Sequence, residues 1–228
     1  MKKLSKRFKK LIDISKNKKV ESFDDLIPKV KANCTTKFDE SVDVSFKLNL
    51  KSKKEESTLR TIVNLPNGNG KKIKIAVLCD NNKSDEAKSA GADFFEHETL
   101  IKDITNGKIN FDKLIATPEM MKKIAKLGKV LGPKGLMPNP KLGTVTENIA
   151  SAVKQIKSGQ IEIRNDKDGN ISASIGRKSF DEKKLKDNYV AFKQTILKEK
   201  PTSIKGDYIM SAFLTSTMGV SYQLKLKD

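Results

Sequence analysis

Residues Gly128–Val145 read GKVLGPKGLMPNPKLGTV, and this stretch carries the strongest structural signal in the chain. It combines glycines with three prolines and three lysines around a short apolar core; these are Pro133, Pro138, Pro140, Lys129, Lys134 and Lys141. Proline fixes the backbone angle φ whereas glycine leaves it free, so the stretch specifies its backbone one residue at a time. Lysines on a backbone of defined shape predict a loop surface that meets an anion.

The charge of the whole chain points the same way. Its 228 residues include 46 Lys and Arg against 28 Asp and Glu, for a formal net charge of +18. Such an excess makes a polyanion, above all a nucleic acid, the expected partner. The alternative is a lysine-biased proteome, because only Arg7, Arg60, Arg164 and Arg177 stand beside the many lysines.

The cysteines and the apolar pattern indicate the cellular compartment and whether the chain meets a membrane. Cys34 and Cys79 lie far apart and form neither a metal-ligand spacing nor a disulfide framework, so we expect a reducing compartment and no metal or other cofactor. No apolar run reaches the roughly 18 residues of a membrane span. Residues 1–15 read as a short basic amphipathic helix, with a membrane-surface helix as the alternative.

The hydrophobic pattern predicts an α/β protein in three zones. The first zone holds alternating strands, such as Val42–Leu50 and Thr58–Leu65. The middle zone alternates short apolar runs such as Ile73–Leu78 with helices, which is typical of a parallel sheet covered by helices. The last zone returns to alternating strands around a helix over Leu185–Ile196.

Residues 1–67 and 160–228 would therefore form one split α+β domain, with residues 68–159 inserted as an α/β domain. The two crossings, Asn67–Gly70 and Lys157–Gln160, both contain glycine and would make a two-chain hinge. The alternative is a single α/β domain with a long decorated tail.

Several local features follow from turn and cap residues. Ser22, Thr117 and Thr146 are expected to cap helices, and Asp93–Glu96 is expected to be a short strand. Ile161–Arg164 and Ile171–Ile175 are expected to pair as a hairpin around the turn between them.

The sequence contains no motif that indicates an enzymatic function. His97 is the only histidine and stands in FFEHE, where a structural or exposed role is favoured. The glycine-rich segments do not fit the phosphate-binding templates, because Pro133 and Ile73 occupy positions that need glycine. The competing class, a soluble α/β enzyme on anionic substrates, lacks a catalytic constellation.

Three segments outside the opening stretch favour RNA contact. Arg164-Asn165-Asp166-Lys167 offers a planar donor fork, amide and carboxylate groups and an ammonium, although a plain Asx-rich turn is the alternative. Ser211–Gly219 is rich in small hydroxyl residues that could approach an RNA backbone, or could form an ordinary edge strand. Phe38 could stack on a nucleotide, although periodicity favours a core position.

Together these residues resemble one family along almost the whole chain, the universal first protein of the large ribosomal subunit, in its bacterial type. The similarity rests on GKVLGPKGLMPNPKLGTV together with KFDESVDV at Lys37–Val44, AKSAGAD at Ala87–Asp93, IRNDKDG at Ile163–Gly169 and TSTMG at Thr215–Gly219. Several long motifs in the same order are far more specific than any one of them.

The resemblance implies a split α+β domain that holds the RNA of the mobile stalk and an inserted Rossmann-like domain without a cofactor. It implies a non-enzymatic, cytoplasmic protein of the large ribosomal subunit, monomeric outside the ribosome. The implied partners are large-subunit ribosomal RNA, exit-site tRNA and the messenger of its own operon, which it would repress. The implied ribosomal-RNA contacts are Lys37, Phe38, Ser41, Arg164, Asn165, Asp166, Lys167, Ser211, Thr217, Met218 and Gly219. The lysines of the opening stretch, Lys129, Lys134 and Lys141, would then face tRNA.

Overall fold

The computed structural model describes residues 5–16, 19–50, 59–80, 83–95, 97–202, 204 and 206–226, with only the backbone at position 97. The chain divides into two compact units. Unit 1 comprises Met1–Gly70 and Ile161–Asp228, and unit 2 comprises Lys71–Gln160. The protein is a mixed α/β protein, as the sequence predicts.

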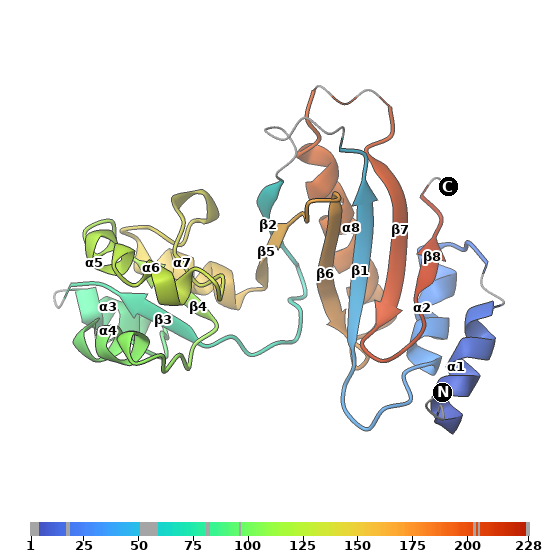
Figure 1. Cartoon of the computed structure of the whole chain (residues 1–228), viewed down its shortest axis with the longest axis horizontal. Helices are drawn as coiled ribbons and strands as arrows, with labels where there is room; N and C mark the ends of the chain where they lie inside the picture. The colour runs from blue at the N-terminus through green and yellow to red at the C-terminus, as the bar shows by residue number, and fades with distance from the viewer. Residues whose placement is uncertain are drawn as a thin grey trace. The chain divides into compact units, whose positions relative to one another are not determined.

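Unit 1 is built on a four-stranded antiparallel sheet in the order β6-β1-β7-β8 (Figure 1). Its strands are β1 (Ser41–Leu48), β6 (Asn170–Arg177), β7 (Ile209–Ser216) and β8 (Tyr222–Leu224). A separate two-stranded sheet joins β2 (Arg60–Asn64) to β5 (Gln160–Arg164). The helices are α1 (Lys6–Lys16), α2 (Phe23–Ala32) and α8 (Glu182–Lys198).

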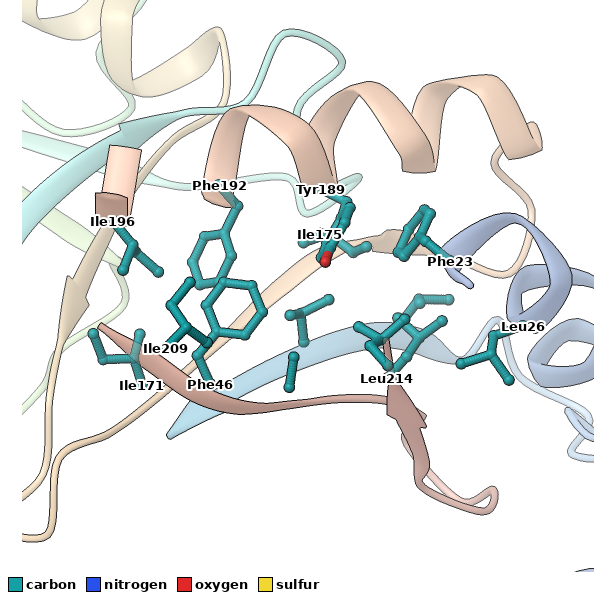
Figure 2. Close-up of a cluster of buried hydrophobic side chains, with 14 of the residues drawn as sticks. Phe23, Leu26, Phe46, Ile171, Ile175, Tyr189, Phe192, Ile196, Ile209 and Leu214 are labelled. Atoms are coloured by element: carbon teal, nitrogen blue, oxygen red, sulfur yellow. The ribbon is translucent and has the colours of Figure 1, made fainter. Parts of the chain in front are cut away.

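The core of unit 1 lies between this sheet and helices α2 and α8 (Figure 2). Residues of β1 alternate strictly between buried and half-buried, so Phe46 and its same-face neighbours all point inward. The Phe46 ring centroid lies 5.2 Å from that of Phe192 and 6.2 Å from that of Tyr189. Tyr189 in turn stacks on Phe23 at 4.1 Å, which ties α8 to α2. The opposite face of β6, β1 and β7 is turned towards the viewer in Figure 1, with no described helix over it.

Unit 2 contains a parallel pair of strands, β3 (Ile75–Leu78) and β4 (Lys113–Ala116). Its helices are α3 (Ser84–Ser89), α4 (His97–Thr105), α5 (Met121–Ala125), α6 (Gly128–Leu131), the 3₁₀ helix η2 (Pro140–Leu142) and α7 (Ile149–Lys157). Side chains of the two strands enter two separate apolar clusters, one on each face. This explains why the strands read as continuous apolar runs.

One predicted strand pairing is wrong. The turn after Arg164 forms, with the Asp166 amide donating to the carbonyl of Asn170 at 2.9 Å, but the flanking strands separate. β5 pairs with β2, whereas β6 pairs with β1. Alternation predicts a strand but does not name its partner, and here each strand finds its apolar neighbours in a different sheet.

Two predicted helix caps are also wrong. α5 begins at Met121 after a short turn, and the buried Thr117 hydroxyl has no hydrogen-bond partner among the described residues. α7 is capped by Asn148, whose side chain accepts from the Ser151 amide at 3.1 Å. Ser22, by contrast, caps α2 as predicted by accepting from the Asp25 amide.

The segment expected as the strand Asp93–Glu96 makes only an isolated bridge between Phe94 and Ala76, and Glu96 lies outside the described residues. The stretch Gly128–Val145 is not one loop, because α6 and η2 lie within it. Asn139 starts η2 by accepting from the Lys141 amide at 2.9 Å, and Gly143 ends it with a φ of 64°. Proline and glycine therefore shape the backbone here as predicted.

Candidate nucleic-acid interface

The residues expected to contact ribosomal RNA gather at the two ends of β1. Near its first residue lie Lys37, Phe38, Ser41, Thr217, Met218 and Gly219, called here the Met218 group. Near its last residue lie Arg164, Asn165, Asp166, Lys167 and Ser211, called here the Arg164 group; Ser211 pairs with Lys47, and the Leu48 amide donates to the carbonyl of Gly169. β1 has eight residues, so at roughly 3.4 Å per residue the two groups stand about 24 Å apart.

Hydrogen bonds join the two loops of the Met218 group. The Thr217 amide donates to the Ser41 carbonyl at 3.1 Å, and the Ser41 amide donates to the Thr217 hydroxyl at 3.0 Å. Phe38 is 54% exposed and Met218 is 50% exposed, so of the two alternatives for Phe38 the core position is wrong and its ring remains open to stacking on a nucleotide. At Gly219 a Cβ atom would lie 2.1 Å from the Ser216 hydroxyl oxygen, which explains the glycine at this position.

Glu40 holds these loops together and was not predicted as a site residue. Its side chain is completely buried. One carboxylate oxygen accepts from the Thr36 hydroxyl at 2.7 Å and from the Thr36 amide at 3.3 Å, and the other accepts from the Met218 amide at 3.1 Å. Burial alone would raise the pKa of Glu40, but the hydrogen bonds from Thr36 and Met218 outweigh it and hold the pKa below its ordinary value.

The arginines show which cationic groups are already engaged. Arg7 on α1 donates to the Met218 carbonyl at 2.6 Å and to the Thr35 hydroxyl at 2.7 Å. Arg60 pairs with Glu162, and Arg177 donates to the backbone carbonyls of Asp39 and Gly70. Arg164 is exposed, and within the described part of the chain its guanidinium has neither a hydrogen bond nor an ion pair. The scarcity of arginine could have identified Arg7 as well as Arg164.

Within the Arg164 group, Asn165 and Asp166 build the turn itself. Asn165 is almost fully buried and accepts from the Leu59 amide at 2.6 Å. Asp166 accepts from the amides of Asn170 at 2.7 Å and Asp168 at 3.0 Å, and these bonds lower the pKa of Asp166. The arrangement leaves Arg164 and Lys167 to face outward from the turn.

Polar side chains on the open face of the sheet connect the two groups. On β1 they are Asp43, Ser45 and Lys47, which alternate with the buried core residues. The Ser45 and Ser172 hydroxyl oxygens lie 2.9 Å apart. Burial raises the pKa of Asp43. Between the two groups the sheet thus offers short hydroxyl side chains, to which a nucleic-acid backbone could approach closely.

In unit 2, Lys129 lies on α6, Lys134 follows that helix and Lys141 lies in η2. All three side chains are exposed, and none pairs with a carboxylate among the residues that the structure describes. Their predicted contact with an anion stays a prediction.

Two other kinds of site can be assessed in the described ranges. These ranges contain no group of three or more His, Cys, Asp or Glu side chains that could hold a metal ion. None of their helices is both long enough and apolar enough to cross a membrane.

Comparison with known proteins identifies the family of the chain. Residues 30–220 match the family described as "Ribosomal protein L1p/L10e family". The chain is 56% identical over 223 residues to the "Large ribosomal subunit protein uL1" of Pelagibacter ubique, covering 97% of each chain. It is 48% identical to the protein of that name from Prochlorococcus marinus, covering 99% of this chain and 96% of that one, and 44% identical to the one from Fervidobacterium nodosum, covering 99% and 97%. On the family match and these full-length similarities, the chain belongs to the ribosomal protein L1p/L10e family.

Proposed function

We propose that the chain holds large-subunit ribosomal RNA through the Met218 group and the Arg164 group of unit 1. The family makes it a structural component of the large ribosomal subunit in the cytoplasm and not an enzyme. Beyond the family assignment, we propose where the RNA binds. One RNA element spans both ends of β1 and lies along the open face of the sheet between them.

The observation that carries the proposal is the guanidinium of Arg164, which has no partner among the described residues. Three of the four arginines are engaged with other groups of the protein, whereas the donor fork of Arg164 points to no described partner. A planar fork is suited to two parallel hydrogen bonds with a phosphate or a base edge. At the other end of β1, the exposed Phe38 and Met218 offer apolar surfaces on which unstacked bases can rest.

The test is a substitution that conserves the positive charge, compared with a matched control variant. Arg164→Lys keeps the positive charge but removes the fork, so we expect about tenfold weaker binding to a stalk fragment of the large-subunit RNA. Arg60→Lys makes the same exchange in β2, where an ion pair with Glu162 remains possible, and it should leave the affinity unchanged. Equal affinities for the two variants would contradict the role of Arg164.

A second comparison separates the two units. Thr217→Val or Met218→Ala should weaken binding to the stalk fragment, whereas Lys134→Ala should barely change it. Binding to the fragment should also weaken steeply as salt rises, because lysines release counterions from the RNA. A damaging Lys134→Ala variant would place the RNA on unit 2, and a flat salt response would contradict the electrostatic contribution.

The exposed lysines of unit 2 favour a second role toward exit-site tRNA. Lys134→Glu combined with Lys141→Glu should slow the release of exit-site tRNA while the protein still assembles into the subunit. We extend the proposal to the messenger of the chain's own operon, which would compete for the same surface of unit 1 if it contains a similar fold. Adding the stalk fragment should then release a repressed messenger in a translation assay.

The proposal also includes independent movement of the two units about the crossings at residues 67–70 and 157–160. Scattering profiles of the free protein should require more than one arrangement of the units. A profile that fits one rigid shape, with and without RNA, would contradict this part.

A further inference from the structure

We propose that Glu40 is a positioning residue that fixes the Met218 group in its RNA-binding shape without touching the RNA. This inference rests on the proposed function of unit 1 and deepens it. Glu40 lies two residues before Val42, where the buried face of β1 begins, and its side chain is completely buried. Burying a carboxylate costs free energy because the charge loses its contact with water. The hydrogen bonds that Glu40 accepts compensate for this cost.

The bonds of Glu40 link two loops that are far apart in the sequence. On one side its carboxylate accepts from the hydroxyl and amide of Thr36, and on the other it accepts from the amide of Met218. The Met218 amide points into the protein as a result, and the Met218 side chain is left half exposed. The chain on either side of Glu40 strengthens the link, because the Lys178 amide donates to the Glu40 carbonyl at 2.8 Å and the Thr217 amide donates to that of Ser41.

Residue 40 must be a carboxylate because both of its side-chain oxygens accept hydrogen bonds. Replacing Glu40 by glutamine keeps the shape but turns one acceptor into an NH₂ donor. That donor would face either the Met218 amide or the Thr36 amide, which are obligate donors, although the Thr36 hydroxyl could donate to the Phe38 carbonyl and accept from the new NH₂ group. One of the two loops therefore loses a backbone hydrogen bond to residue 40. A charge-assisted hydrogen bond is among the stronger ones, and its loss at a binding loop corresponds to about tenfold or more in affinity.

The sign of the effect separates positioning from electrostatics. Glu40→Gln raises the net charge of the chain by one, so electrostatics alone predicts tighter binding to any RNA. Positioning predicts the opposite for the stalk fragment, and no loss for a duplex RNA of the same length and unrelated sequence. Glu199→Gln makes the same charge change at an exposed residue of unit 1, whose carboxylate accepts from the Thr61 hydroxyl at 3.3 Å.

The experiment measures the affinity of the full-length chain, Glu40→Gln and Glu199→Gln for both RNAs. We expect Glu40→Gln to lose at least about tenfold for the stalk fragment only, and Glu199→Gln to lose nothing. If Glu40→Gln binds the stalk fragment as well as Glu199→Gln, the positioning role is refuted. If the native chain does not prefer the stalk fragment over the duplex, the proposed function itself fails, and the two failures are thus distinguishable.

One measurement needs no variant and covers the case in which Glu40→Gln does not fold. In the free native chain the Met218 amide should exchange with deuterium far more slowly than an unprotected amide, because Glu40 accepts its hydrogen bond. An unprotected Met218 amide would overturn the proposal.

Discussion

Replacing the buried Asn188 by alanine should destabilise unit 1 by about 3 kcal/mol. Asn188 lies in α8, is completely buried and uses all of its polar side-chain atoms. Its amide group donates to the carbonyls of Gly68 at 2.8 Å and Ile175 at 2.7 Å, and its oxygen accepts from the Asn67 amide at 3.1 Å. It therefore holds the chain crossing after β2 against the helix and the sheet.

The magnitude follows from these three bonds. A net contribution of about 1 kcal/mol each gives about 3 kcal/mol. Asn67 and Gly68 are half-buried, so their backbone groups can find water after the substitution. Ile175 cannot, because it is buried at the irregularity in the pairing of β6 with β1, where the register skips it. An unsatisfied carbonyl there would raise the loss, to about 4 or 5 kcal/mol.

Tyrosine emission during urea unfolding provides a selective assay for unit 1. The chain has three tyrosines and no tryptophan, and Tyr189, Tyr208 and Tyr222 all lie in unit 1. The signal thus reports unfolding of this unit even if unit 2 unfolds separately. Gln194→Ala, at an exposed position of the same helix, serves as the control and should change stability by less than about 0.5 kcal/mol. A loss below about 1 kcal/mol for Asn188→Ala would refute this account of the three bonds.

Three further predictions concern the core, the turn at Gly219 and the turn at Asp166. Phe46→Ala should cost about 3–5 kcal/mol in the tyrosine assay, since it removes a fully buried ring, whereas Phe8→Ala on exposed α1 should cost little; similar losses would contradict the assigned core. Gly219→Ala should weaken binding to the stalk fragment because its Cβ would overlap the Ser216 hydroxyl, whereas Gly128→Ala meets no atom within 4 Å and should bind normally in the same titration. The pKa of Asp166 is lowered chiefly by the Asn170 amide, so the charged carboxylate stabilises the turn at every pH above the ordinary pKa of aspartate. This stabilisation should be lost as the pH falls through the lower pKa of the folded protein. A pKa of Asp166 at or above the ordinary value, measured by NMR titration of its carboxyl group, would contradict this prediction.

The elements of both units could be predicted where burial follows a regular period. β1 alternates as expected, and Leu185, Tyr189, Phe192 and Ile196 line the buried side of α8. In these segments each side chain is placed by the local backbone geometry, so a single sequence contains the information.

Strand partners and helix caps depend on contacts that a local pattern does not contain. β5 and β6 follow each other closely along the chain, yet they pair with β2 and β1. Thr117 and Thr146 both suit a helix start, but at α7 the first turn is completed by Asn148, closer to the helix. The cap is selected by where tertiary packing begins the helix, and residue type alone does not determine this.

The candidate site depends even more on residues without a periodic signal. Phe38, next to a lysine before β1, reads as a core residue by pattern but is exposed. Asn165, expected as an RNA contact, is buried and joins the turn after β5 to the backbone of Leu59. A periodic pattern could place neither residue, because both lie in loops whose shape is set by hydrogen bonds to distant segments.

This difference separates the stretch Gly128–Val145 from the Met218 group. Prolines and an Asn139 cap shape the first within a few residues, so the turns of its backbone follow from its own sequence, although α6 within it was not predicted. The second is shaped by Glu40, whose partner Met218 lies 178 positions away. A search for functional residues restricted to exposed side chains would therefore find Lys134 and Met218 but omit Glu40. If the positioning role is correct, Glu40→Gln will be more damaging to RNA binding than the loss of any single exposed lysine, although it adds positive charge.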